Sequence, residues 1–513
     1  MEKQPAELAH LEDPVERTTS IEIQKPRISE ETYLADDAVT EKRKKSPTEK
    51  KLVLKSDLVI VPLAALIYFT AYLDRNSIGL ANVMGMSKDL GLTSNQYYNC
   101  LMMFYVGYIT FMLPANVGLR LFPKLPPNYI LGGSALLFGG FLTAMSAAQG
   151  YETALSMRVL IGSSQAFIQG LGLYASMWYK RDEVATRGAI YYGAATISGA
   201  FSGLIAYAIQ NTLTLERTGR EPWRWLFIIE GSMALFIGAL VVVFLPRFPD
   251  QLRGRKHWLF RPEEVELAVQ RMRTYNTVGA KFRARQILTV LKDPKCWLFA
   301  LINAGIANGI GSVGLFLPTF VHEFGFSRER TLLFSVIPYA CATVVLVMVG
   351  KASDWANRKG IFLVGTLSTV AIGYILLLTV SSTAVKIFAA CLITSGLYPS
   401  VILLVSWLGV NTGGFTKRGT TWAVAEIFGQ CFSIMGTHIY DGAPRFIKGH
   451  SILLGFILLA IFNSCVLIWW MNRENKRRDA IEQEYRDRGE THPHATLSLE
   501  DVQDFHISFR YIL

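Results

Sequence analysis

The sequence has few charged residues for its length. Of its 513 residues, 18% are charged and 51% are hydrophobic, whereas an average soluble chain is about a quarter charged. The net charge of +11 would indicate nucleic-acid binding in a soluble protein. Here the basic residues lie in tails and loops between apolar segments, where they orient helices in a membrane. The composition therefore excludes a soluble enzyme, and no nucleic-acid partner is expected.

Cysteine is scarce, and its spacing does not suggest a metal site. The six cysteines are scattered singly, without a Cys-x-x-Cys pair, so neither a metal site nor a disulfide framework is predicted.

The sequence also lacks a nucleotide-binding loop and the HExxH, GxSxG and kinase signatures. Any transport by this chain would draw its energy from an ion gradient, here taken to be the proton gradient, and no cofactor is expected.

Long apolar runs are what the sequence does contain. A helix needs about 20 apolar residues to cross a bilayer, and twelve segments of the chain approach that length. They lie near residues 57–80, 97–118, 128–148, 152–178, 187–211, 224–246, 295–320, 331–350, 360–381, 384–411, 418–441 and 450–472. The sequence therefore predicts an all-α membrane protein with 12 transmembrane helices in two six-helix halves, residues 57–246 and 295–472.

Lysine and arginine gather in alternate connections, which places both termini in the cytoplasm. Residues 1–56 are predicted to be a disordered cytoplasmic tail, and residues 473–513 a second cytoplasmic tail. The basic central loop, 247–294, contains a predicted interfacial helix at 262–272 that would pack on the cytoplasmic faces of both halves. Two six-helix halves joined by a long basic loop are typical of a transporter built from internal repeats.

The loop between the eighth and ninth spans carries a compact motif. It contains Gly350, Asp354, Arg358 and Lys359, where glycine permits a close helix approach, the acid suits a helix N-terminus and the basic pair anchors the surface. We expect these four residues to form a latch that holds one conformation and breaks on switching. A generic positive loop is the alternative. The equivalent stretch of the first half, 114–120, contains no acid.

Charged residues lie inside the first and fourth apolar spans. Arg158 in the fourth span costs about 2.5–3.5 kcal/mol on insertion scales, so it should face a polar cavity. Gly162 lies on the same helix face and would allow a close neighbour. Asp74 and Arg75 end the first span, and their adjacency directs them to different faces. Protonation of Asp74 would free Arg75 from pairing with it and let it bind an anion. The alternatives are a purely structural buried ion pair for Arg158 and, for Asp74-Arg75, a pair that snorkels to the interface at a helix end.

Further intramembrane polar residues are candidates for the same site. Glu230 and Glu426 are costly enough to indicate proton coupling alongside Asp74, with structural pairing as the alternative. The predicted substrate-contacting residues are Arg75, Arg158, Gln165, Gln169, Asn303 and Trp407. Other aromatic candidates for the cavity wall are Tyr72, Tyr105, Tyr108, Tyr174, Tyr192 and Tyr398.

The loop motif and the Arg158-x-x-x-Gly162 pattern resemble the major facilitator superfamily. Further stretches resemble its anion:cation symporter family, and within that family the fungal allantoate permease group. They are Trp178–Glu183 with Arg187, Ser198–Tyr207, Asn411–Arg418, Asp441–His450 and the final Phe509–Leu513. The resemblance covers about residues 50–513.

This resemblance implies proton-coupled import of a small organic anion across the plasma membrane, and we expect a monomer. Members of the group import allantoate, ureidosuccinate, nicotinate, pantothenate, biotin or cysteine. Related organic-anion symporters keep an Asp-Arg pair in the first helix, matched here by Asp74-Arg75. They also carry an acid where this chain has Gln165, so Asp74 is the leading candidate for proton coupling.

Three other functions stay open at this point. A proton-driven exporter of a metabolite, for instance from a fungal biosynthetic pathway, would use the same fold in the opposite direction. A non-transporting nutrient sensor would be expected to carry a longer signalling tail. A membrane-embedded enzyme would need a catalytic cluster, and none is visible in the sequence.

Overall fold

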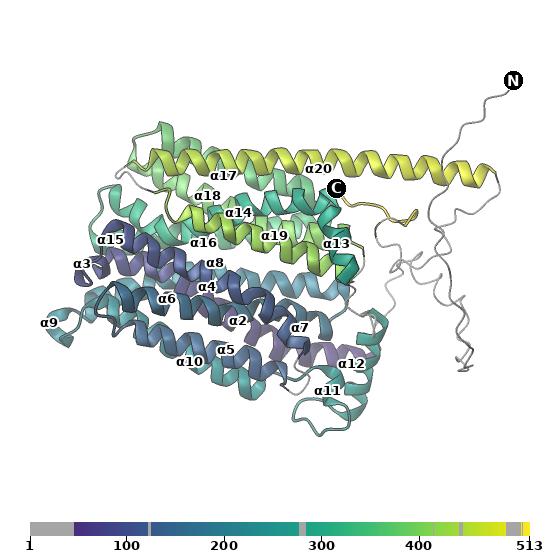
Figure 1. Ribbon diagram of the computed structural model, residues 1–513, viewed down its shortest axis with the longest axis horizontal. Helices are drawn as coiled ribbons and strands as arrows, with labels where there is room; N and C mark the ends of the chain where they lie inside the picture. The colour runs from purple at the N-terminus through teal and green to yellow at the C-terminus, as the bar shows by residue number, and fades with distance from the viewer. Residues whose placement is uncertain are drawn as a thin grey trace. The chain divides into compact units, whose positions relative to one another are not determined.

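The computed structural model describes residues 46–121, 125–275, 284–413, 415–440, 445–488, 504 and 506–513. Within these ranges the regular structure is entirely helical, and residues Thr48–Leu513 form one unit by their contacts. Its long helices run side by side, as Figure 1 shows. The all-α prediction is therefore confirmed for the described part of the chain.

Each of the twelve predicted spans overlaps a helix or a run of helices. These are α2 (Pro47–Val83), α4 (Ser94–Leu121), α5 (Pro127–Met145), α6 (Tyr151–Gln165) with η1 (Ala166–Gln169) and α7 (Gly170–Trp178), α8 (Arg181–Thr212), α10 (Pro222–Phe244), α14 (Pro294–Glu323), α15 (Arg328–Phe334) with α16 (Val336–Ala356), α17 (Lys359–Thr379), α18 (Thr383–Asn411), α19 (Phe415–Gly436) and α20 (Ile447–Asp487). Nine helical segments among the described residues are long and apolar enough to cross a membrane. The count of twelve crossings stays a prediction.

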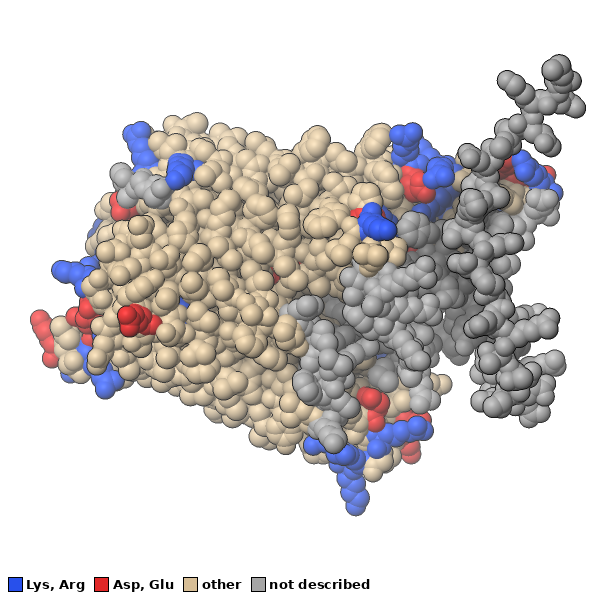
Figure 2. Space-filling model, in the orientation of Figure 1, with Lys and Arg blue, Asp and Glu red and all other residues tan. Residues whose placement is uncertain are grey.

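The surface of the bundle is apolar between two charged ends. On the face shown in Figure 2, lysine, arginine and acidic atoms gather at both ends, and the wall between them is almost free of charge. Large apolar side chains such as Phe236, Phe462 and Val243 are about two-thirds exposed. Such an apolar surface suits lipid rather than water, so the protein is an integral membrane protein.

The short helices lie at the two ends of the bundle. Figure 1 shows α3 (Met86–Asp89) and α9 (Leu215–Thr218) at one end, and α11 (Pro249–Leu252), α12 (Pro262–Tyr275) and α13 (Ala284–Lys292) at the other. The second group belongs to the predicted cytoplasmic central loop. We refer to these ends as the α3/α9 end and the α12/α13 end. Which end faces the cytoplasm stays a prediction.

The helices pack mainly within each half of the chain. In the first half α5 packs on α10 and α4 on α6, and in the second α17 packs on α18 and α14 on α19. Contacts between the halves join α8 to α15, α16 and α18, and α4 to α19. The interface between α4, α8, α14 and α19 is where a central site would lie.

Several segments differ from the sequence-based prediction. Helix α2 begins at Pro47, so the last residues assigned to the tail are helical. Helix α12 was expected to pack on both halves, but its described ion pairs with other long helices, from Glu264 to Lys55 and from Arg271 to Glu49 and Glu183, lead to α2 and α8 of the first half. The second amphipathic helix, α13, was not predicted, and it packs on α19 and α14 instead.

Candidate substrate and proton site

A buried ion pair connects the first and fourth predicted spans. Asp74 on α2 is 0% exposed and Arg158 on α6 is 1% exposed. The Nη1 atom of Arg158 lies 3.4 Å from Oδ1 of Asp74, and Nε2 of Gln165 donates to Oδ2 of Asp74 over 2.8 Å. An unpaired charge inside a membrane protein is costly. The pairing of Asp74 with Arg158 therefore accounts for the burial of both charges.

Close helix packing positions this pair. A Cβ atom at Gly162 would overlap the backbone carbonyl of Phe104, so α6 lies directly against α4. The predicted role of Gly162 as a close-approach residue is confirmed. Immediately after Gln165 the helix tightens into the 3₁₀ turn η1, and such a break within a helix often marks a functional hinge.

Arg75 points away from its neighbour Asp74, as their adjacency predicts. Its guanidinium carbon lies 4.7 Å from the ring centre of Tyr108, 5.0 Å from that of Tyr72 and 5.1 Å from that of Phe104. These distances are in the range of cation–π attraction. Its Nε atom donates to Oε1 of Gln165 over 3.3 Å. The direct Asp74–Arg75 pairing is not formed, since Asp74 pairs with Arg158 and the amide of Gln165 stands between Asp74 and Arg75.

A central cavity lies between the halves and receives Arg75. Its volume is about 60 Å³, room for about four or five waters. Four of the predicted site residues line it: Arg75, Gln169, Asn303 and Glu426. Of the aromatic candidates, Tyr72, Tyr105, Tyr192 and Tyr398 also line it. The cavity is therefore suited to a small solute with aromatic and polar contacts.

Glu426 faces this cavity from α19 and accepts hydrogen bonds from two amides. Nε2 of Gln430 donates to Oε1 over 2.8 Å, and Nδ2 of Asn303 lies 3.4 Å from Oε2. Asn303 also donates to the backbone carbonyl of Ala425 over 2.8 Å. Both amide groups thus donate to the carboxylate and fix its orientation in the cavity wall.

Glu230 on α10 lies apart from the cavity, inside the first half. It is 1% exposed and accepts a hydrogen bond from Ser77, whose hydroxyl also lies 2.9 Å from that of Ser202. Ser77 lies three residues, or about one helical turn, beyond Asp74 on α2. Glu230 is therefore a second buried acid close to the Asp74 position, and its part in proton coupling stays a prediction.

Comparison with known proteins identifies the family once this geometry is described. Residues 64–437 match the Major Facilitator Superfamily. The chain belongs to this superfamily. Its members' fold is a transporter fold, so the protein is a membrane transporter and not an enzyme.

Named relatives agree with this assignment. A high-affinity nicotinic acid transporter of Saccharomyces cerevisiae is 29% identical over 473 residues, which cover 91% of this chain and 85% of the relative. The MFS-type transporter cnsO of Penicillium expansum is 30% identical over 482 residues, 91% of each chain. Among solved structures, the proton:xylose symporter XylE bound to 6-bromo-6-deoxy-D-glucose has a TM-score of 0.64 at 16% identity, covering 80% of this chain and 94% of that one. This likeness shows the fold.

The superfamily loop motif is open in this structure. A Cβ atom at Gly350 would have no neighbour within 4 Å, so the close helix approach expected there is not formed. Asp354 pairs with Lys359 of the same loop, and its side chain is 70% exposed. Asn357 takes a left-handed backbone conformation that ends α16 just before Arg358. The latch role of these residues stays a prediction for another conformation of the transporter.

Three of the predicted substrate-contacting residues lie outside the cavity wall of this transporter. Arg158 and Gln165 do not line the cavity; Gln165 accepts a hydrogen bond from Arg75 directly, and Arg158 is joined to Gln165 through Asp74. Trp407 is 0% exposed, packs its ring against the backbone at Gly360 and donates from Nε1 to the backbone carbonyl of Ile512 over 2.8 Å. Its contacts are thus structural ones near the chain's C-terminus.

Sequence reasoning missed several cavity residues of the second half. Trp422, Gln430 and Ser433 line the cavity with Glu426, and their spacing of three or four residues puts all of them on one face of α19. That spacing is the sequence pattern from which these residues could have been predicted to share a wall with Glu426. Asn76, which accepts a hydrogen bond from Tyr339 over 3.3 Å, follows Arg75 directly and could have been found with it.

The halves of the transporter meet closely toward the α3/α9 end. A Cβ atom at Gly79 on α2 would overlap the carbonyl of Leu315 on α14. Tyr98 on α4 donates to the carbonyl of Tyr440 over 3.0 Å, and Thr343 on α16 donates to Thr196 on α8 over 3.0 Å. These contacts close one side of the central cavity.

Proposed function

We propose that this transporter imports a small organic anion together with protons, as a member of the anion:cation symporter family and its fungal allantoate permease group. The observation that carries the proposal is the position of Arg75. Its side chain lines the central cavity, where a carboxylate could bind it, and its Nε atom is joined through Gln165 to the buried Asp74–Arg158 pair. An anion site and a protonatable acid are thus connected by one amide.

The amide supplies a physical route for coupling. An ionised Asp74 only accepts hydrogen bonds, so it holds the Nε2 group of Gln165 and leaves Oε1 for Arg75. Protonation of Asp74 weakens its attraction to Arg158. The neutral acid also no longer needs hydrogen bonds from both Arg158 and Gln165. Gln165 is then free to turn, and Arg75 becomes available to the substrate carboxylate.

The contacts between the halves support an inward-facing conformation. The hydrogen bonds from Tyr98 on α4 to the carbonyl of Tyr440 beyond α19, and from Thr343 on α16 to Thr196 on α8, lie toward the α3/α9 end, which we assign to the outside, while the loop motif at Gly350–Lys359 is unlatched. In this assignment both termini are cytoplasmic and the central cavity is closed to the outside. We propose a plasma-membrane location and a monomer as the working unit.

The relatives favour import of an organic acid. The Saccharomyces cerevisiae relative is named for nicotinic acid transport, and a pyridine carboxylate is small, flat and anionic. Such a molecule matches a cavity that pairs an arginine with tyrosine walls. The substrate class proposed for this chain is therefore a small carboxylate, without further restriction at this stage.

Uptake measurements test this function. Permease-deficient yeast expressing the chain would be given radiolabelled nicotinate, pantothenate, biotin, allantoate and cysteine at pH 5 and pH 7, with and without a protonophore. The proposal expects uptake of at least one compound, faster at pH 5 and lost with the protonophore. Surface-expressed protein that takes up none of them, or takes one up without regard to the proton gradient, would contradict it.

A further inference from the structure

The central cavity carries opposite charges on its two sides. Arg75 comes from α2 of the first half, and Glu426 comes from α19 of the second, and both line the same cavity. Glu426 is held by the amides of Gln430 and Asn303. Within the part of the chain that the structure describes, Glu426 forms no ion pair. Its carboxylate therefore faces the cavity with hydrogen-bond acceptor capacity left for a ligand.

The remaining wall restricts the ligand to a small, partly flat molecule. Tyr72, Tyr105, Tyr192, Tyr398 and Trp422 surround the space between the two charged groups. Aromatic rings provide apolar contact for the middle of a solute and attract groups that carry positive charge. The wall therefore favours a molecule whose polar groups are at its ends.

A simple monoanion fits this arrangement poorly. Its carboxylate can bind Arg75, but its apolar remainder would leave the Glu426 carboxylate facing a group that offers no hydrogen bond. Glu426 keeps its bonds from Gln430 and Asn303, but its remaining acceptor capacity would face an apolar group, and such a mismatch discriminates against a ligand. A ligand that brings an N–H donor or a positive charge to Glu426 satisfies both ends.

We propose that the substrate is a carboxylic acid whose other end carries an N–H donor or a protonated nitrogen, and that Glu426 is the residue that selects it. This inference rests on the proposed function, since it requires Arg75 to bind the carboxylate. It extends that function by naming a second recognition element on the opposite half of the transporter. Binding one molecule at both ends would also draw the halves together.

Matched ligand pairs test the proposal on the purified full-length protein. Ligand-dependent stabilisation against heat would be measured for nicotinate against benzoate, and for γ-aminobutyrate against valerate, at pH 5. The members of each pair share a carboxylate and shape but differ in the nitrogen. In at least one pair, we expect the nitrogen-bearing acid to bind at least 10-fold more tightly. The Glu426→Gln variant should reduce that preference to less than threefold, while Arg75→Gln should weaken both members.

The control and the contrary outcomes separate this inference from the function it rests on. Glu323→Gln removes an exposed acid from the end of α14 and should leave the preference unchanged. Glu426→Asp serves if Glu426→Gln does not fold. Equal binding within both pairs, or a preference that survives Glu426→Gln, overturns the role of Glu426 while leaving carboxylate transport standing. No binding by any of the four acids overturns the proposed carboxylate site itself.

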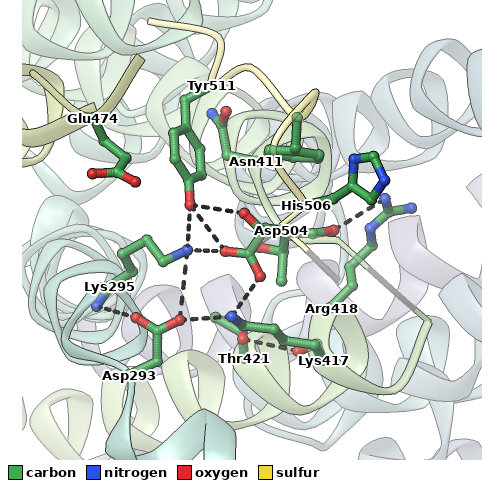
Figure 3. Close-up of polar contacts among 12 residues, drawn as sticks. Asp293, Lys295, Asn411, Lys417, Arg418, Thr421, Glu474, Asp504, His506 and Tyr511 are labelled. Carbon is green, nitrogen blue, oxygen red and sulfur yellow. Dashed lines mark hydrogen bonds and ion pairs between the residues drawn. The ribbon is translucent and has the colours of Figure 1, made fainter. Parts of the chain in front are cut away.

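A second inference comes from the C-terminal segment, here Asp504 with residues 506–513. Asp504 is 0% exposed and lies 2.5 Å from Nζ of Lys417, and it also pairs with Lys295. Asp293 lies 2.7 Å from Lys417. Figure 3 shows these two acids and two lysines alternating around one buried centre, with the hydroxyl of Tyr511 beside them. Although burial alone would raise the pKa of Asp293, the two lysines hold it below its ordinary value.

Side chains of two helices hold the backbone of this segment. Asn411 on α18 accepts from the amide of Ile512 over 2.7 Å and donates to its carbonyl over 2.8 Å. Asn475 on α20 makes the same two bonds with Tyr511, each of 2.8 Å. The segment is thus bound like a peptide ligand, by paired amide contacts at one end and by the Asp504 cluster at the other.

We infer that the C-terminal segment is a clasp that holds the ends of α14, α18, α19 and α20 together. Lys295 is on α14, Trp407 and Asn411 on α18, Lys417 on α19 and Asn475 on α20, and each contacts the segment. Because α14 and α19 also carry Asn303 and Glu426, the clasp would keep the second half rigid when it moves during transport. This inference depends only on the described contacts and not on the identity of the substrate.

Cysteine labelling tests the clasp in the full chain. Cys296 follows Lys295 and is 2% exposed, so a variant that keeps Cys296 as its only cysteine reports opening of this region to a maleimide. Asp504→Ala and, separately, Asn475→Ala should raise its labelling rate at least 10-fold. Asp479→Asn, which removes an exposed ion pair with Arg510, is the control and should leave the rate unchanged. Unaltered labelling in both Asp504→Ala and Asn475→Ala would refute the clasp.

Discussion

Removing Arg158 gives the sharpest test of the buried ion pair. In the Arg158→Ala variant, Asp74 remains fully buried with Gln165 as its described hydrogen-bond partner. Breaking a buried pair by deleting one partner typically costs about 3–5 kcal/mol, because an uncompensated charge is left behind. At about 1.4 kcal/mol for each factor of ten, this is a shift of two to three orders of magnitude or more in any equilibrium that needs an ionised Asp74.

We expect Arg158→Ala to reach the membrane and to lose uptake. Part of the cost is avoided if Asp74 stays protonated, but the variant then cannot release a proton during the cycle. The companion variants are Asp74→Asn and the double variant Asp74→Asn with Arg158→Ala. Thermal unfolding of the purified proteins measures stability, and uptake corrected for surface expression measures transport.

The double-mutant comparison separates packing from charge. Since both charges are gone in the double variant, it should be more stable than Arg158→Ala alone, by about 2 kcal/mol or more, and should still fail to accumulate substrate. Wild-type uptake by Arg158→Ala would refute the role of the pair in transport. Equal stability of Arg158→Ala and the double variant would refute the uncompensated-charge argument.

Three further predictions follow from the structure. Asp74→Asn, which mimics the protonated acid, should abolish the pH dependence of uptake while keeping substrate exchange, as measured by counterflow in proteoliposomes; retained proton-driven accumulation would contradict this. Gly162→Leu should lower the melting temperature by several degrees, since even its Cβ meets the carbonyl of Phe104, whereas Gly350→Leu, with open space around it, should not. The lowered pKa of Asp293 means that its contribution to stability is fully present above its ordinary pKa near 4 and is lost only as the pH falls through the lower folded value. Asp293→Asn should therefore lower the melting temperature by the same amount at pH 5 and at pH 6, and a smaller loss at pH 5 would show that Asp293 is already protonated there.

The sequence predicted the helices and the direction of single side chains well. The twelve apolar segments overlap helices because a span leaves a continuous run of about 20 apolar residues, which is a local signal. The divergence of Asp74 and Arg75 and the close approach at Gly162 are also local, since they follow from helix geometry alone. The i, i+4 relation of Glu426 and Gln430 is likewise local, and helix geometry could have predicted their contact.

Contacts between distant segments could not be read in this way. Trp407 was predicted to contact substrate because it is an aromatic residue in a span, but its partner is the carbonyl of Ile512, 105 residues further along. Asp504 lies in a stretch whose charge resembles an ordinary solvated tail, although its carboxylate is completely buried. The pairing of Arg158 with Asp74 rather than with the open cavity likewise depends on how α2 and α6 meet.

The contacts of Gln165 are compatible with the proposed proton coupling although this position carries no acid. Glutamine cannot titrate, and Asp74 was therefore the leading candidate for proton coupling in the comparison with related symporters. In the structure the amide of Gln165 donates to Asp74 and accepts from Arg75, and the 3₁₀ turn that begins at the next residue ends at Gln169, which lines the cavity. One short segment of the fourth span thus contacts the proposed proton acceptor, the proposed anion-binding arginine and the cavity itself. In the proposed mechanism a change in the charge of Asp74 alters the hydrogen bonds of this segment first, so we expect Gln165 to act through its orientation where a related symporter would act through its charge.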